Sequence, residues 1–330
     1  MAVPNDLAAD SVPLRLTPEV RRARDAGSPV VVLESSVLAQ GLPIPANREA
    51  AHRMTRAVDA SGATPAISAV VRGTPTLGLE PDELDRFLAR EGVRKVSARD
   101  LAPAIVRGAD GATTVAASLA LAVAGGLHVF ATGGIGGVHQ DARFDESADL
   151  AELARSPIVV VCAGAKSILD LPATLERLET LGIPVIGYRT DDFPGFFTTG
   201  TGLPVPWRVD DPDEIASLYR HHRALGRREA ILVVQPPPTE LALPRTLVDG
   251  AVAGALGDAR AAGIAGAAVT PFLLAAVERA TAGRSLAVNL ALLEANARLA
   301  GEIAVAIGSE LVRAVRSERA GEPRSGPLSA

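Results

Sequence analysis

The chain has 330 residues, 48% of them hydrophobic and 22% charged, and its formal net charge at pH 7 is −5. This composition is typical of a globular protein with a large core, and the acidic balance argues against a nucleic-acid polymer as partner, because such partners require a basic patch. The single cysteine, Cys162, excludes an internal disulfide bond and a multi-cysteine metal site. The N-terminus lacks a signal-peptide pattern, and no apolar stretch reaches the roughly 20 residues of a membrane span. We therefore expect a soluble, cytoplasmic protein with no membrane partner.

Short apolar runs recur along the chain, and helical patterns separate several of them. The expected strands are 30–34, 65–71, 128–132, 158–164, 184–188 and 230–234. The expected helices are 111–126, 172–182, and, in the C-terminal third, segments near 244–262, 270–282 and 285–316. Continuous apolar strands that alternate with helices indicate a largely parallel sheet covered on both faces. We expect one α/β domain over residues 13–316 with a helical C-terminal part, and flexible tails over 1–12 and 317–330.

Polar or glycine-rich segments follow four of the expected strands. Glu34 closes the first strand, GGIGGVH (133–139) follows the third, Lys166 follows the fourth, and RTDDFPGFF (189–197) follows the fifth. Ligands of open parallel sheets bind beyond the carboxyl ends of the strands. The pattern therefore predicts a ligand site along one edge of the sheet.

Only two of the 33 basic side chains are lysines, Lys95 and Lys166. Arginine stays protonated, whereas a lysine whose pKa is lowered by burial can act as an amine nucleophile. Lys166 comes soon after the buried run VVVC, so we expect a desolvated amine that attacks a sugar or carbonyl carbon. The alternatives are a phosphate-binding charge or a core lysine paired with a carboxylate. Lys95, in VRKVSARDL, is either a second phosphate-binding amine or an exposed lysine beside a strand.

Three carboxylic acids are candidates for chemistry. Glu34, in LESS, can be a general acid or base, or alternatively a turn or N-cap residue. Asp145 and Asp149 lie four residues apart in FDESADL. If this segment is helical, both carboxylates project from one face and suit Mg²⁺ or Mn²⁺, although such pairs are also common on solvated helices.

Further segments carry groups that can recognise a ligand. The glycines of 133–139 let backbone amides approach a ligand closely, and His139, where a dinucleotide loop would need glycine, either titrates or is structural. Thr114 lies in GATTV, which is expected to open a helix whose N-terminus either receives an anion or is merely capped by threonine. Asn289 lies within an apolar face of 283–300 and either reads a polar ligand or is satisfied in the core.

Together these segments resemble the pseudouridine-5′-phosphate glycosidase family, also called indigoidine synthase A-like proteins. The stretches that carry the resemblance span about residues 30–306 and are LESSVLAQGLPIPANREAA, KVSARDL, GATTVAASL, VFATGGIGGVH, FDESADLAELARSPIVVVCAGAKSILD, GYRTDDFPGFF, VTPFLL and GRSLAVNLALLEANARLAGEIA. The resemblance implies a three-layer α/β/α fold, a homotrimer, and an enzyme of pseudouridine catabolism. Such an enzyme reversibly cleaves the C–C glycosidic bond of pseudouridine 5′-phosphate to give uracil and ribose 5-phosphate.

The resemblance also implies roles for individual residues. Lys166 matches the covalent nucleophile and Glu34 the proton donor. Asp145 matches the ligand of a divalent metal, with Mn²⁺ the usual ion of the family. Substrate-binding positions of the family are matched by Lys95, Val115, Ser147, Ala148 and Asp149, and a further active-site position by Asn289. Thr114 and His139 are candidate substrate-binding residues from their own segments, not from the resemblance.

The implied chemistry explains why a lysine is needed. A C–C glycosidic bond has no leaving oxygen to protonate, unlike the bond that two-carboxylate glycosidases cleave. Attack by Lys166 on the anomeric carbon, with Glu34 protonating the ring oxygen, would open the ribose, and the resulting imine would act as an electron sink for the bond to uracil. An arginine cannot form that imine.

Two features depart from the family pattern, and two rival functions stay open. Gln40 stands where the family usually has histidine, and the loop between His139 and Phe144 looks shortened. The first rival is a Schiff-base aldolase or lyase that acts on another sugar phosphate. The second is a non-catalytic sugar-phosphate-binding protein.

Overall fold

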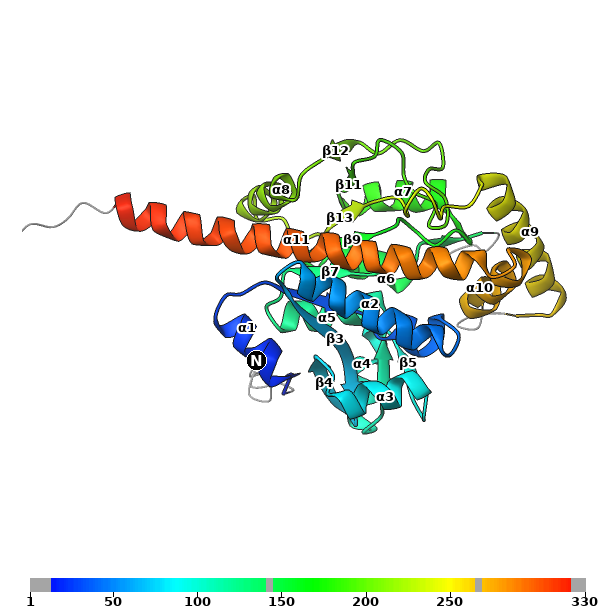
Figure 1. Cartoon of the computed structure of the whole chain (residues 1–330), viewed down its shortest axis with the longest axis horizontal. Helices are drawn as coiled ribbons and strands as arrows, with labels where there is room; N and C mark the ends of the chain where they lie inside the picture. The colour runs from blue at the N-terminus through cyan, green and yellow to red at the C-terminus, as the bar shows by residue number, and fades with distance from the viewer. Residues whose placement is uncertain (1–12, 141–144, 265–268, 322–330) are drawn as a thin grey trace, which may run out of the picture.

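The computed structural model describes residues 13–140, 145–264 and 269–321 (Figure 1). The tail expected over 1–12 lies outside the described residues, as do residues 322–330 of the second tail. Most of the loop in which a shortening was expected, 141–144, lies outside them too.

Eleven strands of the described residues form one mixed sheet. In spatial order its main path is β1 (Arg15–Leu16), β4 (Thr74–Leu77), β3 (Thr64–Val71), β2 (Val30–Leu33), β7 (Val129–Ala131), β9 (Val159–Cys162), β13 (Ile231–Val234), β11 (Val185–Tyr188) and β12 (Trp207–Val209). Two more strands branch from β3, namely β6 (Gly111–Thr113) and β5 (Arg94–Val96). The pairs β3–β4 and β3–β6 are antiparallel and the other pairs are parallel. The expectation of a largely parallel sheet is confirmed.

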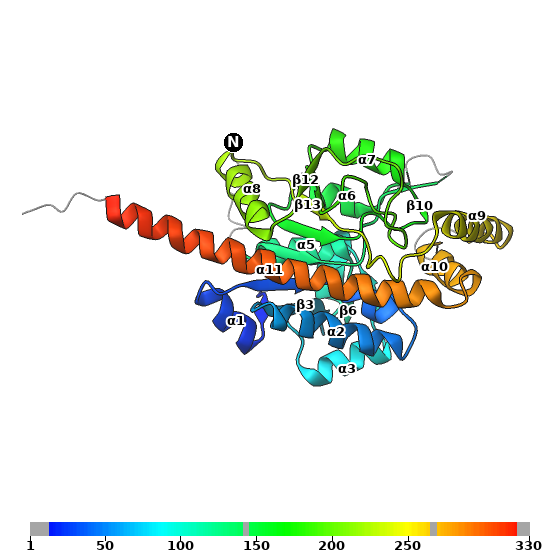
Figure 2. The same cartoon turned by 45° about the horizontal axis from the view of Figure 1, so that its top comes forward.

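Helices cover both faces of this sheet (Figures 1 and 2). They are α1 (Pro18–Asp25), α2 (Ala46–Ala60), α3 (Pro81–Ala89), α4 (Leu101–Val106), α5 (Val115–Ala124), α6 (Ala148–Leu153), α7 (Leu171–Thr180), α8 (Pro212–Ala224), α9 (Arg245–Ala261), α10 (Val269–Ala280) and α11 (Arg284–Gly321). Val37–Gly41 forms a short π-helix and Ala98–Asp100 a 3₁₀-helix. A separate two-stranded antiparallel sheet pairs β8 (Val138–His139) with β10 (Leu169–Asp170). Helix α11 packs against α2, α8 and the central strands β2, β7 and β9, while α5 packs against α6.

The central strands are buried on both faces, which is why their sequences read as unbroken apolar runs. Residues 31–33 of β2 and 159–161 of β9 have no exposed surface, and neither has Phe130 of β7. One continuous hydrophobic cluster joins these strands to α2, α5 and α11. Each fully buried valine, leucine or phenylalanine contributes about 1.5–3 kcal/mol, so the middle of the sheet is a firm base for the loops at its ends.

Two expected boundaries are wrong. The helix expected over 285–316 is α11, and it continues to Gly321, beyond the rest of the described fold (Figure 1). The sequence contains no glycine or proline between 309 and 320, so nothing ends the helix earlier, and the expected tail 317–330 begins within it. Segment 111–113 is strand β6 rather than a first helical turn, because it pairs with β3 and β5. The helix begins at Val115, with Thr114 as N-cap.

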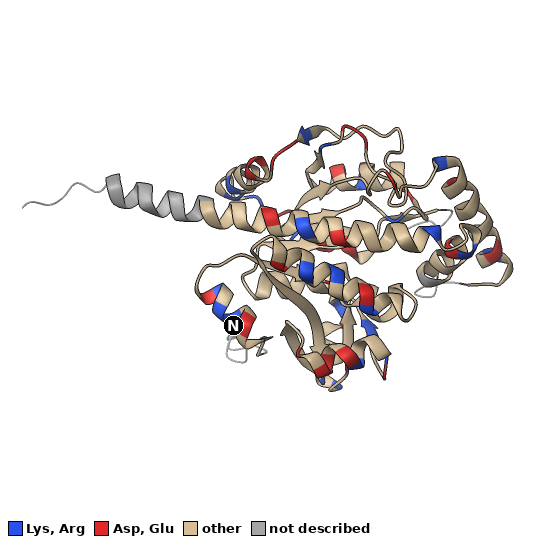
Figure 3. Cartoon of the chain, viewed as in Figure 1, with Lys and Arg blue, Asp and Glu red and all other residues tan. Residues whose placement is uncertain are grey.

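The described surface carries both signs of charge. Figure 3 shows Lys and Arg intermixed with Asp and Glu over the helices that face the viewer. Among the described helices, none combines the length and the apolar character that a membrane crossing needs.

Candidate functional site

The main candidate residues meet because they follow neighbouring strands. β2, β7 and β9 are adjacent and parallel, so their carboxyl ends lie side by side. Glu34 directly follows β2, Thr132 directly follows β7, and Lys166 follows β9 by four residues. The predicted edge of the sheet is therefore where the polar side chains gather.

Backbone hydrogen bonds beyond the strands fix the position of Lys166. The Ile135 amide donates to the Gly164 carbonyl at 3.0 Å, and the Lys166 amide donates back to the Ile135 carbonyl at 3.1 Å. Gly164 has φ +80°, and a Cβ there would lie 2.3 Å from the Pro194 carbonyl oxygen. Only glycine accommodates both constraints, so the CAGAK turn delivers Lys166 to the site with a defined backbone.

Glu34 is 5% exposed, and each of its carboxyl oxygens accepts a hydroxyl hydrogen bond. Thr132 Oγ1 lies 2.5 Å from Oε1, and Ser36 Oγ lies 2.7 Å from Oε2. The Thr132 carbonyl in turn accepts from Asn296 Nδ2 at 2.8 Å, and Asn296 Oδ1 accepts from Gln235 Nε2 at 2.8 Å. This buried network fixes Glu34 relative to the sheet and α11.

Thr132, Asn296 and Gln235 were missed by sequence reasoning. One signal for Asn296 was available, because it follows Asn289 by seven residues and so lies on the same face of a helix. Thr132 and Gln235 follow buried strands without any local pattern that marks them.

A cavity of about 350 Å³ opens at this edge. It collects ten of the eleven predicted site residues: Glu34, Lys95, Thr114, Val115, His139, Asp145, Ser147, Ala148, Asp149 and Lys166. Its remaining lining residues are Ser97, Arg99, Gly136, Glu146, Leu169 and Thr270.

The eleventh predicted residue, Asn289, lines a second, smaller cavity of about 50 Å³. Its other lining residues are Glu34, Val37, Gly41, Gly133, Gly134, Lys166, Phe196 and Leu274. Glu34 and Lys166 are the two residues common to both cavities. Asn289 is 7% exposed, and its Oδ1 has no hydrogen-bond partner among the described residues, so a buried acceptor is available beside Lys166.

Lys95 lies in β5 and reaches the larger cavity. Desolvation lowers the pKa of its amine, and the nearby positive charge of Lys166 lowers it further, while Glu34 and Asp149 act in the opposite direction. The side chain itself borders open space in the cavity and is accessible there. Lys95 is therefore an exposed lysine in a strand, as the alternative held, and its amine also lines the cavity that Lys166 lines.

Asp145 and Asp149 do not share a helix face, because the condition for it, a helix over the whole segment, is not met. Helix α6 begins only at Ala148, so Asp145 lies before it. Asp149 Oδ1 accepts from the Ala116 amide at 3.0 Å and Oδ2 accepts from the Gly136 amide at 2.8 Å. The Asp149 carboxylate therefore ties the start of α5 to the glycine loop.

The amides at the start of α5 are partly used by the protein. Thr114 Oγ1 accepts from the Ala117 amide at 3.5 Å, and Asp149 takes the Ala116 amide. Val115 is the first residue of α5, so its amide has no partner within the helix and is the donor that an anion at this N-terminus can use.

The glycine loop brings side chains close to the backbone. A Cβ on Gly136 would lie 2.2 Å from Ser147 Oγ and 2.9 Å from Asp149 Oδ2. The Gly136 amide donates to the Asp149 carboxylate, so this one amide of the glycine loop is already used by the protein.

The chemistry of Asp145 is compatible with a divalent cation held mainly by water and substrate. Its carboxylate is half exposed, and Oδ2 lies 2.9 Å from His139 Nδ1, while the neighbouring Glu146 is paired with Arg177 at 2.9 Å. Among the described residues there is no group of three or more histidine, cysteine or acidic side chains arranged to hold an ion. A single carboxylate suits Mg²⁺ or Mn²⁺ only when phosphate oxygens and water complete the shell.

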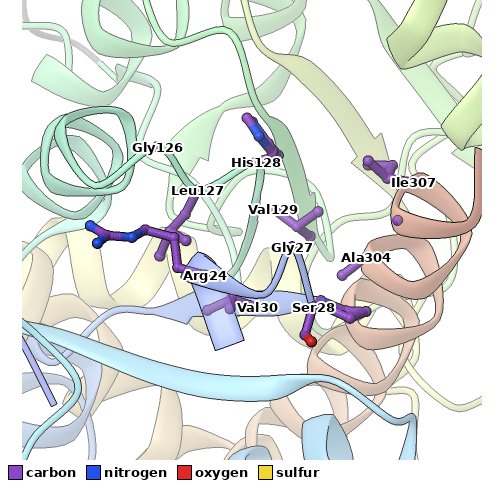
Figure 4. A pocket seen from close by; sticks show the side chains of 12 residues that line it. Arg24, Gly27, Ser28, Val30, Gly126, Leu127, His128, Val129, Ala304 and Ile307 are labelled. Atoms are coloured by element: carbon purple, nitrogen blue, oxygen red, sulfur yellow. The ribbon is translucent and has the colours of Figure 1, made fainter. Parts of the chain in front are cut away.

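A further cavity, of about 120 Å³, lies at the opposite edge of the sheet (Figure 4). It is formed where β2 and β7 begin, so it faces away from their carboxyl ends. Its wall is mostly glycine turns and apolar side chains, with Arg24, Ser28 and His128 as its polar members. The candidate functional residues therefore all belong to the other edge.

The fold and the site together define a class of protein: a three-layer α/β protein with a lysine and a buried carboxyl group at the carboxyl ends of neighbouring parallel strands. This combination suits attack by an amine on an electrophilic carbon.

The sequence profile of indigoidine synthase A-like proteins matches residues 19–306, and the chain belongs to this family. A pseudouridine-5′-phosphate glycosidase of Gemmatimonas aurantiaca is 66% identical over 293 residues, which cover 89% of this chain and 96% of that relative. A pseudouridine-5′-phosphate glycosidase of Herpetosiphon aurantiacus is 51% identical over 296 residues, covering 89% of this chain and 98% of the relative. The family resemblance drawn from the sequence is confirmed.

Solved structures show the same fold. The prealnumycin C-glycosynthase AlnA in complex with ribulose 5-phosphate superposes with a TM-score of 0.85 at 36% identity, covering 92% of this chain and 100% of AlnA. An indigoidine synthase A-like protein from Thermotoga maritima gives a TM-score of 0.82 at 36% identity, covering 90% and 97% of the two chains.

Proposed function

We propose that this protein reversibly cleaves the C–C glycosidic bond of pseudouridine 5′-phosphate, giving uracil and ribose 5-phosphate. The names of the close relatives and the sugar phosphate bound to AlnA support this substrate class. The observation that carries the proposal is that Glu34 and Lys166 line both the larger cavity of about 350 Å³ and the smaller cavity of about 50 Å³. The reacting carbon lies between those cavities, with the sugar phosphate on one side and the base on the other.

The larger cavity takes the phosphate end. Lys95 and Arg99 provide positive charge there, and the Val115 amide, at the N-terminus of α5, has no partner within the helix. Charge-assisted hydrogen bonds of this kind are the usual means of holding a phosphate. Ser147, the N-cap of α6, lines the same wall.

The smaller cavity takes the base. Asn289 Oδ1 is a buried acceptor without a partner, and uracil offers ring N–H groups as donors. A buried polar atom left unpaired costs about 1–3 kcal/mol, so a base that satisfies Asn289 is favoured over an apolar ring of the same size.

The residues carry out the cleavage in balanced steps. The Lys166 amine bonds to C1′ while Glu34 gives a proton to the ring oxygen, and the C1′–O4′ bond breaks. Glu34 regains a proton from the nitrogen of the adduct and delivers it to C5 of uracil. The C1′–C5 bond then breaks and its electrons remain on the base, while the nitrogen lone pair forms the imine. The imine is therefore the product of the cleavage, whereas the mechanism expected from the sequence forms it before the bond to uracil breaks. Water hydrolyses the imine and frees ribose 5-phosphate.

Asp145 is the residue that would hold a divalent cation, with Mn²⁺ as the ion expected from the family. When bound, the ion would neutralise negative charge on the substrate. His139, through its contact with Asp145, orients that carboxylate.

The proposal is tested by incubating the protein with pseudouridine 5′-phosphate and Mn²⁺ and measuring uracil and ribose 5-phosphate by chromatography. We expect both products from the wild type and none above background from Lys166→Arg, which keeps the charge and loses the nucleophilic amine. Lys95→Arg is the matched control, because it makes the same change in the second amine of the site. A folded wild type that releases no uracil contradicts the proposal; a carbonyl product from another sugar phosphate would then indicate the aldolase alternative.

A further inference from the structure

Phe196 has an unusual backbone in the segment that follows β11. Its φ is +65°, a left-handed conformation that is strained for a bulky residue. Strain of this kind persists only where surrounding contacts hold it, and it gathers at ligand-binding sites. The residue belongs to RTDDFPGFF, a segment that the proposed mechanism leaves without a function.

Several contacts hold Phe196 in place. Its amide donates to the Ala163 carbonyl at 3.1 Å, which joins it to the turn that carries Lys166. Its ring packs edge-on against Phe197 with centroids 4.7 Å apart. A Cβ on Gly134 would lie 2.6 Å from Phe196 Cδ2, so the glycine loop is shaped to admit this ring.

These contacts place the ring on the wall of the smaller cavity. Phe196 is 2% exposed and lines that cavity together with Asn289 and Lys166. The cavity measures about 50 Å³, whereas about 10–15 Å³ on the same measure holds one water. The smaller cavity therefore has room for a flat group of a few atoms, and a bulkier group would not fit.

We propose that Phe196 determines which bases the enzyme accepts, by closing the base end of the site to anything larger than a single unsubstituted pyrimidine ring. This inference rests on the proposed function. With this backbone, Phe196 lies on the wall of the cavity that Lys166 also lines. The ring acts as a steric wall and as an apolar face for the base, while Asn289 supplies the polar contact.

The test compares substrates that differ only in bulk. Pseudouridine 5′-phosphate carrying methyl or benzyl at N1, and the same pair at N3, are assayed for release of the substituted uracil. Methyl and benzyl both remove the ring N–H at that position, so the benzyl-to-methyl ratio of kcat/KM reports size alone. The variants are Phe196→Gly, which suits the positive φ, and Phe196→Leu, with Phe87→Leu as the control because Phe87 is equally buried, lies in α3 and lines neither cavity.

We expect the benzyl-to-methyl ratio to rise at least tenfold in Phe196→Gly at one of the two ring positions, and by less in Phe196→Leu. Phe87→Leu should change the ratio by less than twofold. Equal ratios in the wild type and both Phe196 variants at both positions overturn the inference, and so does an equal rise in Phe87→Leu. Wild-type turnover of the unmodified substrate reports the proposed function separately. If that turnover is absent, NMR titration measures the affinities of the protein for methyl- and benzyl-substituted uracils. The benzyl-to-methyl ratio of these affinities, compared between the wild type and the Phe196 variants, then tests the inference.

Discussion

Replacing Thr132 by valine removes one hydroxyl group from the network around Glu34 and little else. Valine keeps the branched Cβ, so the change isolates the hydroxyl group. In the wild type, Thr132 Oγ1 lies 2.5 Å from Glu34 Oε1, and both residues are buried, at 1% and 5% exposure. The carboxyl oxygen in the variant has lost this donor, in a side chain that is only 5% exposed.

The magnitude follows from that geometry. A buried acceptor left without a partner costs about 1–3 kcal/mol, so the free energy of unfolding should fall by about this amount. If the contact also holds Glu34 in the transition state, the same energy corresponds to a loss in kcat of about 5- to 150-fold. Thr132→Ser keeps the donor and should recover most of both losses.

Urea unfolding and uracil release together measure the two effects. A double-mutant cycle with Glu34→Ala assigns the cost, because Thr132→Val should cost much less stability once the acceptor is absent. Wild-type stability and turnover in Thr132→Val, or an undiminished cost in the Glu34→Ala background, would refute the reasoning.

Three further predictions concern other parts of the site. The pKa of Lys95 is lowered below 10.5, so its positive charge is present at low pH and is lost at a lower pH than in an ordinary lysine. KM for the phosphorylated substrate should therefore rise with pH on the alkaline side, and Lys95→Arg should abolish that rise. Gly136→Ala should lower the melting temperature and reduce uracil release at least tenfold, since the new Cβ would lie 2.2 Å from Ser147 Oγ; full activity would contradict this. Burial raises the pKa of the Cys162 thiol to about 12, so iodoacetamide should label the denatured protein and leave the native protein unmodified by mass spectrometry.

The parts of the fold that the sequence predicted are those in which a local pattern decides the structure. β2, β9 and β13 are apolar runs buried on both faces, and their positions were found to within a few residues. The two-residue strand β1 and the three-residue strands β5, β6 and β12 were missed, because such strands are defined by pairing with distant segments and not by periodicity.

The candidate site divides in the same way. The strand-end rule brought Glu34 and Lys166 together, since β2 and β9 both lie beside β7. The rule could not say that both carboxylate oxygens of Asp149 would accept hydrogen bonds from backbone amides, because those amides come from segments far away in the sequence. The left-handed backbone of Phe196 was equally hidden, since it results from tertiary contacts that local sequence does not encode.

The central claim is that the Lys166 amine becomes covalently bound to the sugar phosphate. Adding borohydride during turnover of pseudouridine 5′-phosphate, or with ribose 5-phosphate alone, reduces any imine to a stable secondary amine. Peptide mass spectrometry should then find the reduced ribose 5-phosphate adduct on Lys166 of the wild type, and no adduct in Lys166→Arg. An adduct on Lys95, or continued uracil release with no adduct on either lysine, would contradict the account.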